Sequence, residues 1–195
     1  KTSTGSINRR TFDFISHTAY YFNALTKQIN IDSLDVGIQI LDFLIEAVQG
    51  PCEDNQRALA KSNIINSSMD FLTIFKKRSD YMKRGFFSEE QMSQMDQATA
   101  KSMKLLNAMI EGSSSSNTDI LEGMGSLDFS FLIQKLASYY SHLVREKLNM
   151  NPETASPQEV TMRLPKDAFD QKVLESFDVF ILLSTLADHS PRVAF

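Results

Sequence analysis

Apolar residues recur every three or four positions along most of the chain, the spacing of one face of an α-helix. One stripe of this kind consists of Leu34, Ile38, Leu41, Ile45 and Val48. It follows Asp32 and Ser33, residue types that cap helix N-termini. Gly50 and Pro51 come directly after it and stop a helix. The pattern therefore predicts a helix that ends just before residue 50.

Similar stripes predict further helices on both sides of this one. They lie near residues 11–27, from 53 onward, 64–85, 88–112, 120–121, 126–143 and 167–188. Ser88 and Gln91 have the spacing of a capping box, which marks the start of one of them. Signals for strands are weak, because no Asn-Gly or Asp-Gly turn is flanked by alternating apolar residues.

These elements predict an all-α fold of antiparallel helix pairs. Helices of this length with short connections stack either as an armadillo/HEAT-like solenoid or as a helical bundle. No sharp internal repeat decides between the two. We expect a single domain over residues 1–195, with a serine-rich linker near 112–118 and a polar, proline-containing loop near 149–166.

Net charge, cysteine count and the length of apolar runs exclude several classes of protein. The 195 residues carry a formal net charge of -4, which argues against a general binder of nucleic-acid phosphates. A single cysteine excludes an intrachain disulfide framework. No apolar run approaches the roughly 20 residues of a membrane span. The chain begins with Lys1 rather than Met, so we expect a processed form or a piece of a longer protein.

Catalytic chemistry finds no support in the sequence. Cys52 follows Gly50 and Pro51 at a predicted helix start, but no histidine neighbours it, and we interpret it as a small apolar residue that packs at the turn. His17, His142 and His189 lack the paired spacing of a metal site. We expect no enzyme activity and no cofactor.

Two acidic residues end apolar helices close to a glycine. Glu46 lies four residues before Gly50, and Glu111 directly precedes Gly112. If the two helices stack in parallel layers, their carboxylates approach each other. From the residues alone, both are better explained as ordinary surface positions.

One segment resembles a known family. It reads Gln49-Gly50-Pro51-Cys52-Glu53-Asp54-Asn55-Gln56. It is similar to the signature of the RIH-associated domain of the inositol trisphosphate receptor and ryanodine receptor family. Physically, the Gly-Pro pair ends one helix, the cysteine packs at the corner, and the two amides satisfy free backbone groups in the turn. With looser likeness in the later helices, the resemblance covers about residues 33–195.

The resemblance implies an armadillo-like, non-catalytic cytosolic module of a large tetrameric Ca²⁺-release channel in an endoplasmic-reticulum-type membrane. Its partners would be other domains of the same chain, with no nucleic acid and no membrane contact by this segment. Such modules relay ligand binding to the pore. They also contribute acidic ligands to a Ca²⁺ site shared with another domain, and by position these are Glu46 and Glu111.

An alternative is a stand-alone helical adaptor. Its binding surface would be a methionine-rich groove, and the methionines that recur at helical spacing are Met92, Met95, Met103 and Met109. The same stripe is also what a helix buried in the core would carry.

Overall fold

The computed structural model describes residues 13–50, 52–82, 87–111, 118–125, 130–163 and 171–189. Within these ranges every regular element is helical and there is no strand, which confirms the all-α prediction. The helices are α1 (Phe14–Thr26), α2 (Leu34–Val48), α3 (Glu53–Lys61), α4 (Ile64–Met82), α5 (Glu89–Ile110), α6 (Thr118–Gly125), α7 (Ser130–His142), α8 (Pro157–Arg163) and α9 (Gln171–His189). A short 3-10 turn, η1 (Ile31–Ser33), precedes α2, and a π-helical turn, η2 (Leu143–Lys147), extends α7.

The prediction of a loop over residues 149–166 is wrong for the part that forms α8. Pro157 occupies the first position of this helix, where its missing N–H is no loss. Ser156 and Glu159 bond reciprocally across the helix start, with Oγ of Ser156 accepting from the Glu159 amide and the Glu159 carboxylate accepting from the Ser156 amide. The predicted helix stop at Gly85, the serine-rich linker and the predicted cap at Ser126 lie outside the described residues.

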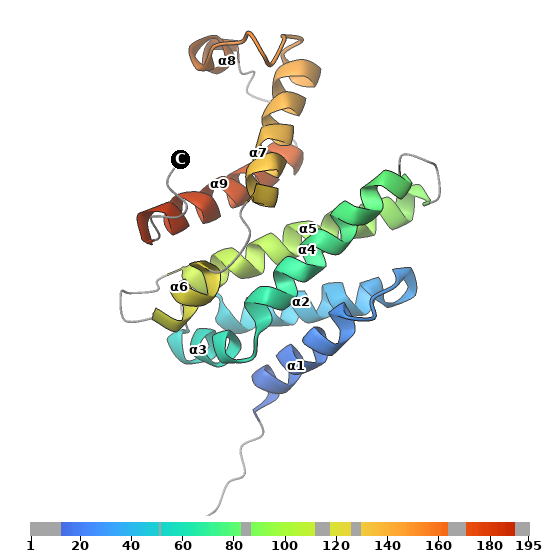
Figure 1. Ribbon diagram of the computed structural model, residues 1–195, viewed down its shortest axis with the longest axis vertical. Helices are drawn as coiled ribbons and strands as arrows, with labels where there is room; N and C mark the ends of the chain where they lie inside the picture. Colours follow the sequence, from blue (N-terminus) through green and yellow to red (C-terminus); the bar gives the residue numbers. More distant parts are fainter. Residues whose placement is uncertain are drawn as a thin grey trace, which may run out of the picture.

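Two antiparallel helix pairs, α1–α2 and α4–α5, form the lower part of the molecule (Figure 1). They stack so that α2 and α5 run side by side in the same direction. Gln94 donates to Asp35 at 3.0 Å, and Lys101 pairs with Asp42. Both contacts join residues 59 positions apart, and a constant offset is what parallel helices produce.

The core lies between these two pairs. Leu41 and Leu44 of α2 pack with Leu105 of α5 in one buried cluster. Phe22 of α1 contacts Phe71 of α4 with ring centroids 5.4 Å apart. Each such fully buried side chain stabilises the fold by about 1.5–3 kcal/mol relative to an exposed one. Apolar packing therefore holds the two helix pairs together.

The methionine stripe belongs to this core. Met95, Met103 and Met109 are almost completely buried, and Met92 is half-buried. They therefore offer no methionine-rich surface of the kind the adaptor alternative needs.

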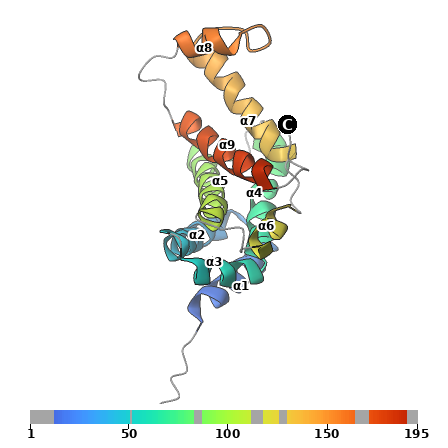
Figure 2. The ribbon, with the colours of Figure 1, turned by 90° about the vertical axis from the view of Figure 1, so that its left-hand side faces the viewer.

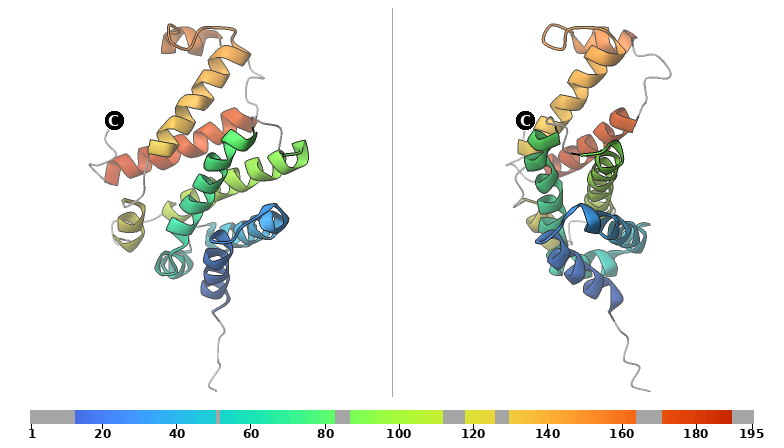
Figure 3. Two further views of the ribbon diagram at one scale, coloured as in Figure 1. Left: turned by 45° about the vertical axis from the view of Figure 1, so that its right-hand side comes forward. Right: turned by 90° about the vertical axis from the view of Figure 1, so that its right-hand side faces the viewer.

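The remaining helices cover the other side of α5. Helix α9 packs along it, and α7 leans across α9 (Figures 1 and 2). Asn107 on α5 donates from Nδ2 to the carbonyl oxygen of Asp178 on α9 at 2.9 Å. Helix α8 lies at the far end of α7, away from α1–α6 (Figure 3). None of the helices in the described ranges is long and apolar enough to cross a membrane.

Candidate functional site

The signature segment forms a corner between α2 and α3. Helix α2 ends at Val48, and Gln49 is already extended, with φ -65° and ψ 140°. Gly50 has φ 75°, in the left-handed region that favours glycine. Helix α3 begins at Glu53, after Cys52 in the N-cap position. The described residues thus confirm a helix break at this place, and Pro51 lies outside them.

Asn55 caps the helix that enters the corner. Its Nδ2 donates to the carbonyl oxygen of Ala47 at 2.6 Å. Ala47 lies in the last turn of α2, where carbonyl groups have no partner within the helix. The prediction that this amide satisfies a free backbone group in the turn is confirmed.

Gln56 has a different partner from the one predicted. Its side chain is fully buried, and Nε2 donates to the carbonyl oxygens of Ala108 at 2.8 Å and Glu111 at 3.0 Å. These carbonyls belong to the end of α5 rather than to the turn. Because α5 runs parallel to α2 and ends beside it, its unpaired carbonyls face the corner.

Cys52 plays a smaller part than expected. Its side chain is half-buried rather than fully enclosed, and it makes no capping hydrogen bond to α3. The corner is held by its two amide side chains more than by the thiol.

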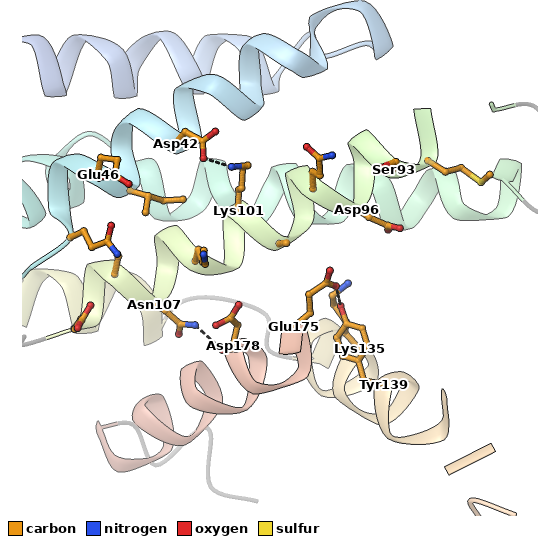
Figure 4. A pocket seen from close by; sticks show the side chains of 18 of the residues that line it. Asp42, Glu46, Ser93, Asp96, Lys101, Asn107, Lys135, Tyr139, Glu175 and Asp178 are labelled. Atoms are coloured by element: carbon orange, nitrogen blue, oxygen red, sulfur yellow. Dashed lines mark hydrogen bonds and ion pairs between the residues drawn. The ribbon is translucent and has the colours of Figure 1, made fainter. Parts of the chain in front are cut away.

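A groove with a volume of about 1090 Å³ runs along α5 between α2 on one side and α7 and α9 on the other (Figure 4). Its lining is strongly acidic. The charged residues are seven carboxylates and three lysines, namely Asp42, Glu46, Glu89, Asp96, Glu111, Glu175 and Asp178 with Lys101, Lys104 and Lys135.

Glu46 and Glu111 both line this groove, and both are exposed. The parallel stacking of α2 and α5 brings the C-terminal ends of both helices to the same place, which the sequence allowed but did not require. Within the described residues, no three acidic, histidine or cysteine side chains are grouped so that they could hold a metal ion. The assignment of these two residues as Ca²⁺ ligands stays a prediction.

Both glutamates stand where a helix disfavours negative charge. The C-terminal end of a helix carries a partial negative charge that favours cations by about 0.3–1 kcal/mol each. Glu46 lies in the last turn of α2 and Glu111 is the C-cap of α5, and neither last turn contains a basic residue. Two exposed carboxylates at negative helix ends therefore both line this groove.

The other wall of the groove holds polar groups that sequence analysis did not single out. Tyr139 donates to Oε2 of Glu175 at 2.6 Å, and Nζ of Lys135 lies 4.9 Å from the Tyr139 ring centroid. Burial lowers the pKa of Lys135, and nearby Glu175 and Asp96 oppose that shift. Burial also raises the pKa of Asp178, with Lys104 opposing and Glu175 adding to the effect. Only the packing of α7 and α9 brings these residues together, so no local motif could have marked them.

Comparison with known families bears on the corner directly. Residues 4–72 match the family described as RyR and IP3R Homology associated. Over this segment, which is about a third of the chain, the sequence is similar to that family, as the resemblance of the Gln49–Gln56 segment predicted. The homology-associated segment contains α1, Glu46 and the whole corner up to Gln56, but it ends within α4.

The extent of the family match differs from the expected one. It includes the first helix, which carries no signature, and it does not reach the later helices in which a looser likeness was expected. Glu111 therefore lies outside the homology-associated segment, and its link to the corner is the bond from Gln56. No curated protein and no solved structure matches the chain.

Proposed function

We propose that this chain is a non-catalytic module of an intracellular Ca²⁺-release channel and that it couples Ca²⁺ binding to opening of the pore. The observation that carries the proposal is the family match over the α2–α3 corner. In this proposal the module acts at the cytosolic face of the endoplasmic reticulum or a related Ca²⁺ store. Its partners are other domains of the same parent chain, which assembles into a tetrameric channel, rather than nucleic acid or lipid.

The acidic groove is the proposed place of Ca²⁺ binding. Ca²⁺ takes six to eight oxygen ligands, usually including carboxylates. Glu46 and Glu111, which line the groove from two helix ends, supply at most four carboxylate oxygens. A second domain docked on the groove would provide the rest. The isolated module would therefore bind Ca²⁺ poorly.

Coupling follows from a site that two domains share. A bound ion stabilises the arrangement in which both domains contribute ligands, so it shifts the equilibrium toward that arrangement. Helices α2 and α5 share one buried cluster and would move as a unit. A displacement of either helix at the groove would then move the other helix with it, rather than being absorbed by flexible loops.

The test is a Ca²⁺ titration of the full-length channel. Glu46→Gln and Glu111→Gln keep the side-chain shape and remove the charge, and we expect each to raise the Ca²⁺ concentration for half-maximal opening. Glu146→Gln is the matched control, because Glu146 is exposed on η2 and does not line the groove. Unchanged Ca²⁺ activation in both groove variants would remove the site assignment.

A stand-alone helical adaptor is the second candidate. The observation that favours it is an exposed apolar face on α9, where Leu174, Phe177 and Ile181 are each about half exposed. Such a face at i, i+3 and i+7 suits an amphipathic partner helix. The reading frame separates the candidates: continuation into a multi-helix membrane region supports the channel, and a stop soon after residue 195 supports the adaptor.

A further inference from the structure

Helix α9 carries apolar side chains on two sides. On one side, Val179, Leu182 and Leu186 are buried in the core cluster that α9 shares with α5. Successive residues of a helix lie about 100° apart around its axis, which places a second set of apolar side chains away from the first. The second set is about half exposed and consists of Leu174, Phe177, Phe180 and Ile181. The outer side of α9 is therefore as apolar as its buried side.

Helix α5 shows what covers a helix of this kind in the same fold. It packs against both α2 and α9. Consecutive side chains such as Leu105 and Leu106 are both completely buried, because α5 has neighbours on more than one side. A helix that is apolar all round is typical of the interior of an assembly. By this criterion α9 is an internal helix, although within the described ranges its outer side is left half exposed.

The order of the helices shows where a further neighbour would lie. Helices α2, α5 and α9 follow one another along the molecule, with α2 packed on α5 and α5 packed on α9 (Figures 1 and 2). In stacked helical repeats each unit buries the apolar side of the next, and terminal units carry a polar outer face. The outer side of α9 continues this series but is not polar. It therefore has the character of an interface to one more helix.

The area of this outer side is too small to hold a separate protein. Two half-exposed phenylalanine rings and two half-exposed aliphatic side chains offer on the order of 350–400 Å². A stable interface between separate chains takes about 800 Å² from each partner. The same shortfall applies to a second copy of this chain docked face to face. A helix of the same chain needs less area, because its covalent tether removes much of the entropic cost of association.

We propose that the outer side of α9 is covered by an amphipathic helix of the same parent chain, contributed by a segment outside residues 1–195. This helix adds one more member to the series α2, α5 and α9. Its own apolar residues recur every three or four positions and pack against the half-exposed set. The inference rests on the proposed function in one respect only, that the chain is part of a longer channel protein. It does not depend on Ca²⁺ binding.

Photo-crosslinking in the full-length channel tests the proposal. The photoreactive residue p-benzoylphenylalanine replaces Ile181 in one variant and Leu174 in a second, so that the test stands if one of them fails to fold. Neither residue lines the acidic groove. The matched control carries the same group in place of Met162, which is 86% exposed on α8 at the far end of α7 (Figure 3). The channel is assembled from isotope-labelled and unlabelled copies, so that mass spectrometry shows whether two crosslinked peptides come from one copy.

We expect irradiation to join position 181 to a peptide that lies outside residues 1–195 and has the apolar spacing of an amphipathic helix. Both peptides carry the same isotope label, because they belong to one chain. Position 174 gives a crosslink to the same segment, displaced by about two helical turns along it. The control at position 162 does not reach this segment.

Other outcomes refute the proposal. Crosslinked peptides with different labels show that a neighbouring copy covers α9, and a crosslink to another protein assigns this side to an external partner, as in the adaptor alternative. Crosslinks confined to residues 1–195, or a yield no higher than that of the control, show that no further helix covers it. The Ca²⁺ titration is independent of these results. The groove variants can shift activation when the crosslink fails, and the crosslink can form when they do not.

Discussion

The phenol oxygen of Tyr139 lies 2.6 Å from Oε2 of Glu175 and donates a hydrogen bond to it. This bond joins α7 to α9 at one wall of the acidic groove. Burial, followed by this hydrogen bond, raises the pKa of the Tyr139 phenol, so the donor stays protonated throughout the physiological range. The phenol can therefore donate to Glu175 and link the two helices throughout this range.

We predict that Tyr139→Phe lowers the free energy of unfolding by about 1.5–3 kcal/mol, the range for a hydrogen bond to a charged group. The ring and its contact with Lys135 remain, so the loss reports the hydroxyl alone. Chemical denaturation of the two proteins measures it. Equal midpoints would mean that the bond adds nothing to the docking of α7 on α9.

At the corner, Gly50 is predicted to resist substitution for conformational reasons only. It has φ 75°, and a Cβ placed on it would meet no atom within 4 Å. Gly50→Ala should cost about 1–2 kcal/mol of stability because of the left-handed backbone, and Gly50→Asn should cost less, since asparagine tolerates that region better. A higher melting temperature for Gly50→Ala than for Gly50→Asn would contradict this account of the corner.

Asp178 gives a pH-dependent prediction. Burial raises its pKa above the ordinary value of 3.8, so the folded state binds this proton more tightly than the unfolded state does. Stability from this group is therefore present at low pH and is lost as the pH rises through the folded-state pKa. Asp178→Asn removes that loss, and its backbone carbonyl still accepts from Asn107.

We expect Asp178→Asn to be more stable than the native chain at pH 7, with the difference shrinking toward pH 3. Denaturant titrations at both values measure it. A native chain that is the more stable of the two at pH 7 would show that the ionised carboxylate is favourable where it stands, for example through Lys104.

Local signals predicted the first part of the fold closely. The apolar stripe from Leu34 to Val48 coincides with α2, and the Ser88–Gln91 capping box starts α5 with both of its bonds present. These features depend on neighbours three or four residues away, which a sequence displays directly. Helix α8 was missed because the proline count of its segment outweighed the capping pair at Ser156 and Glu159.

Features that depend on long-range packing were harder to predict from the sequence. The corner motif led to the family that residues 4–72 match, yet the partner of Gln56 lies at the end of α5, far along the chain. The acidic wall formed by Glu175 and Asp178 exists only because α9 packs on α5. For Glu46 and Glu111, the prediction depended on parallel stacking of their two helices. The constant offset between α2 and α5 shows that these helices do run parallel, and the approach of the two carboxylates stays a prediction.

The central claim is that Glu46 and Glu111 bind Ca²⁺ together at an interface of the channel. Direct calorimetric titration of Ca²⁺ into the purified full-length channel tests it, with the native protein compared with the Glu46→Gln/Glu111→Gln double variant. Our account predicts that the double variant loses one bound Ca²⁺ per subunit while the remaining binding is unchanged. The same number of bound ions at the same affinity in both proteins would contradict it.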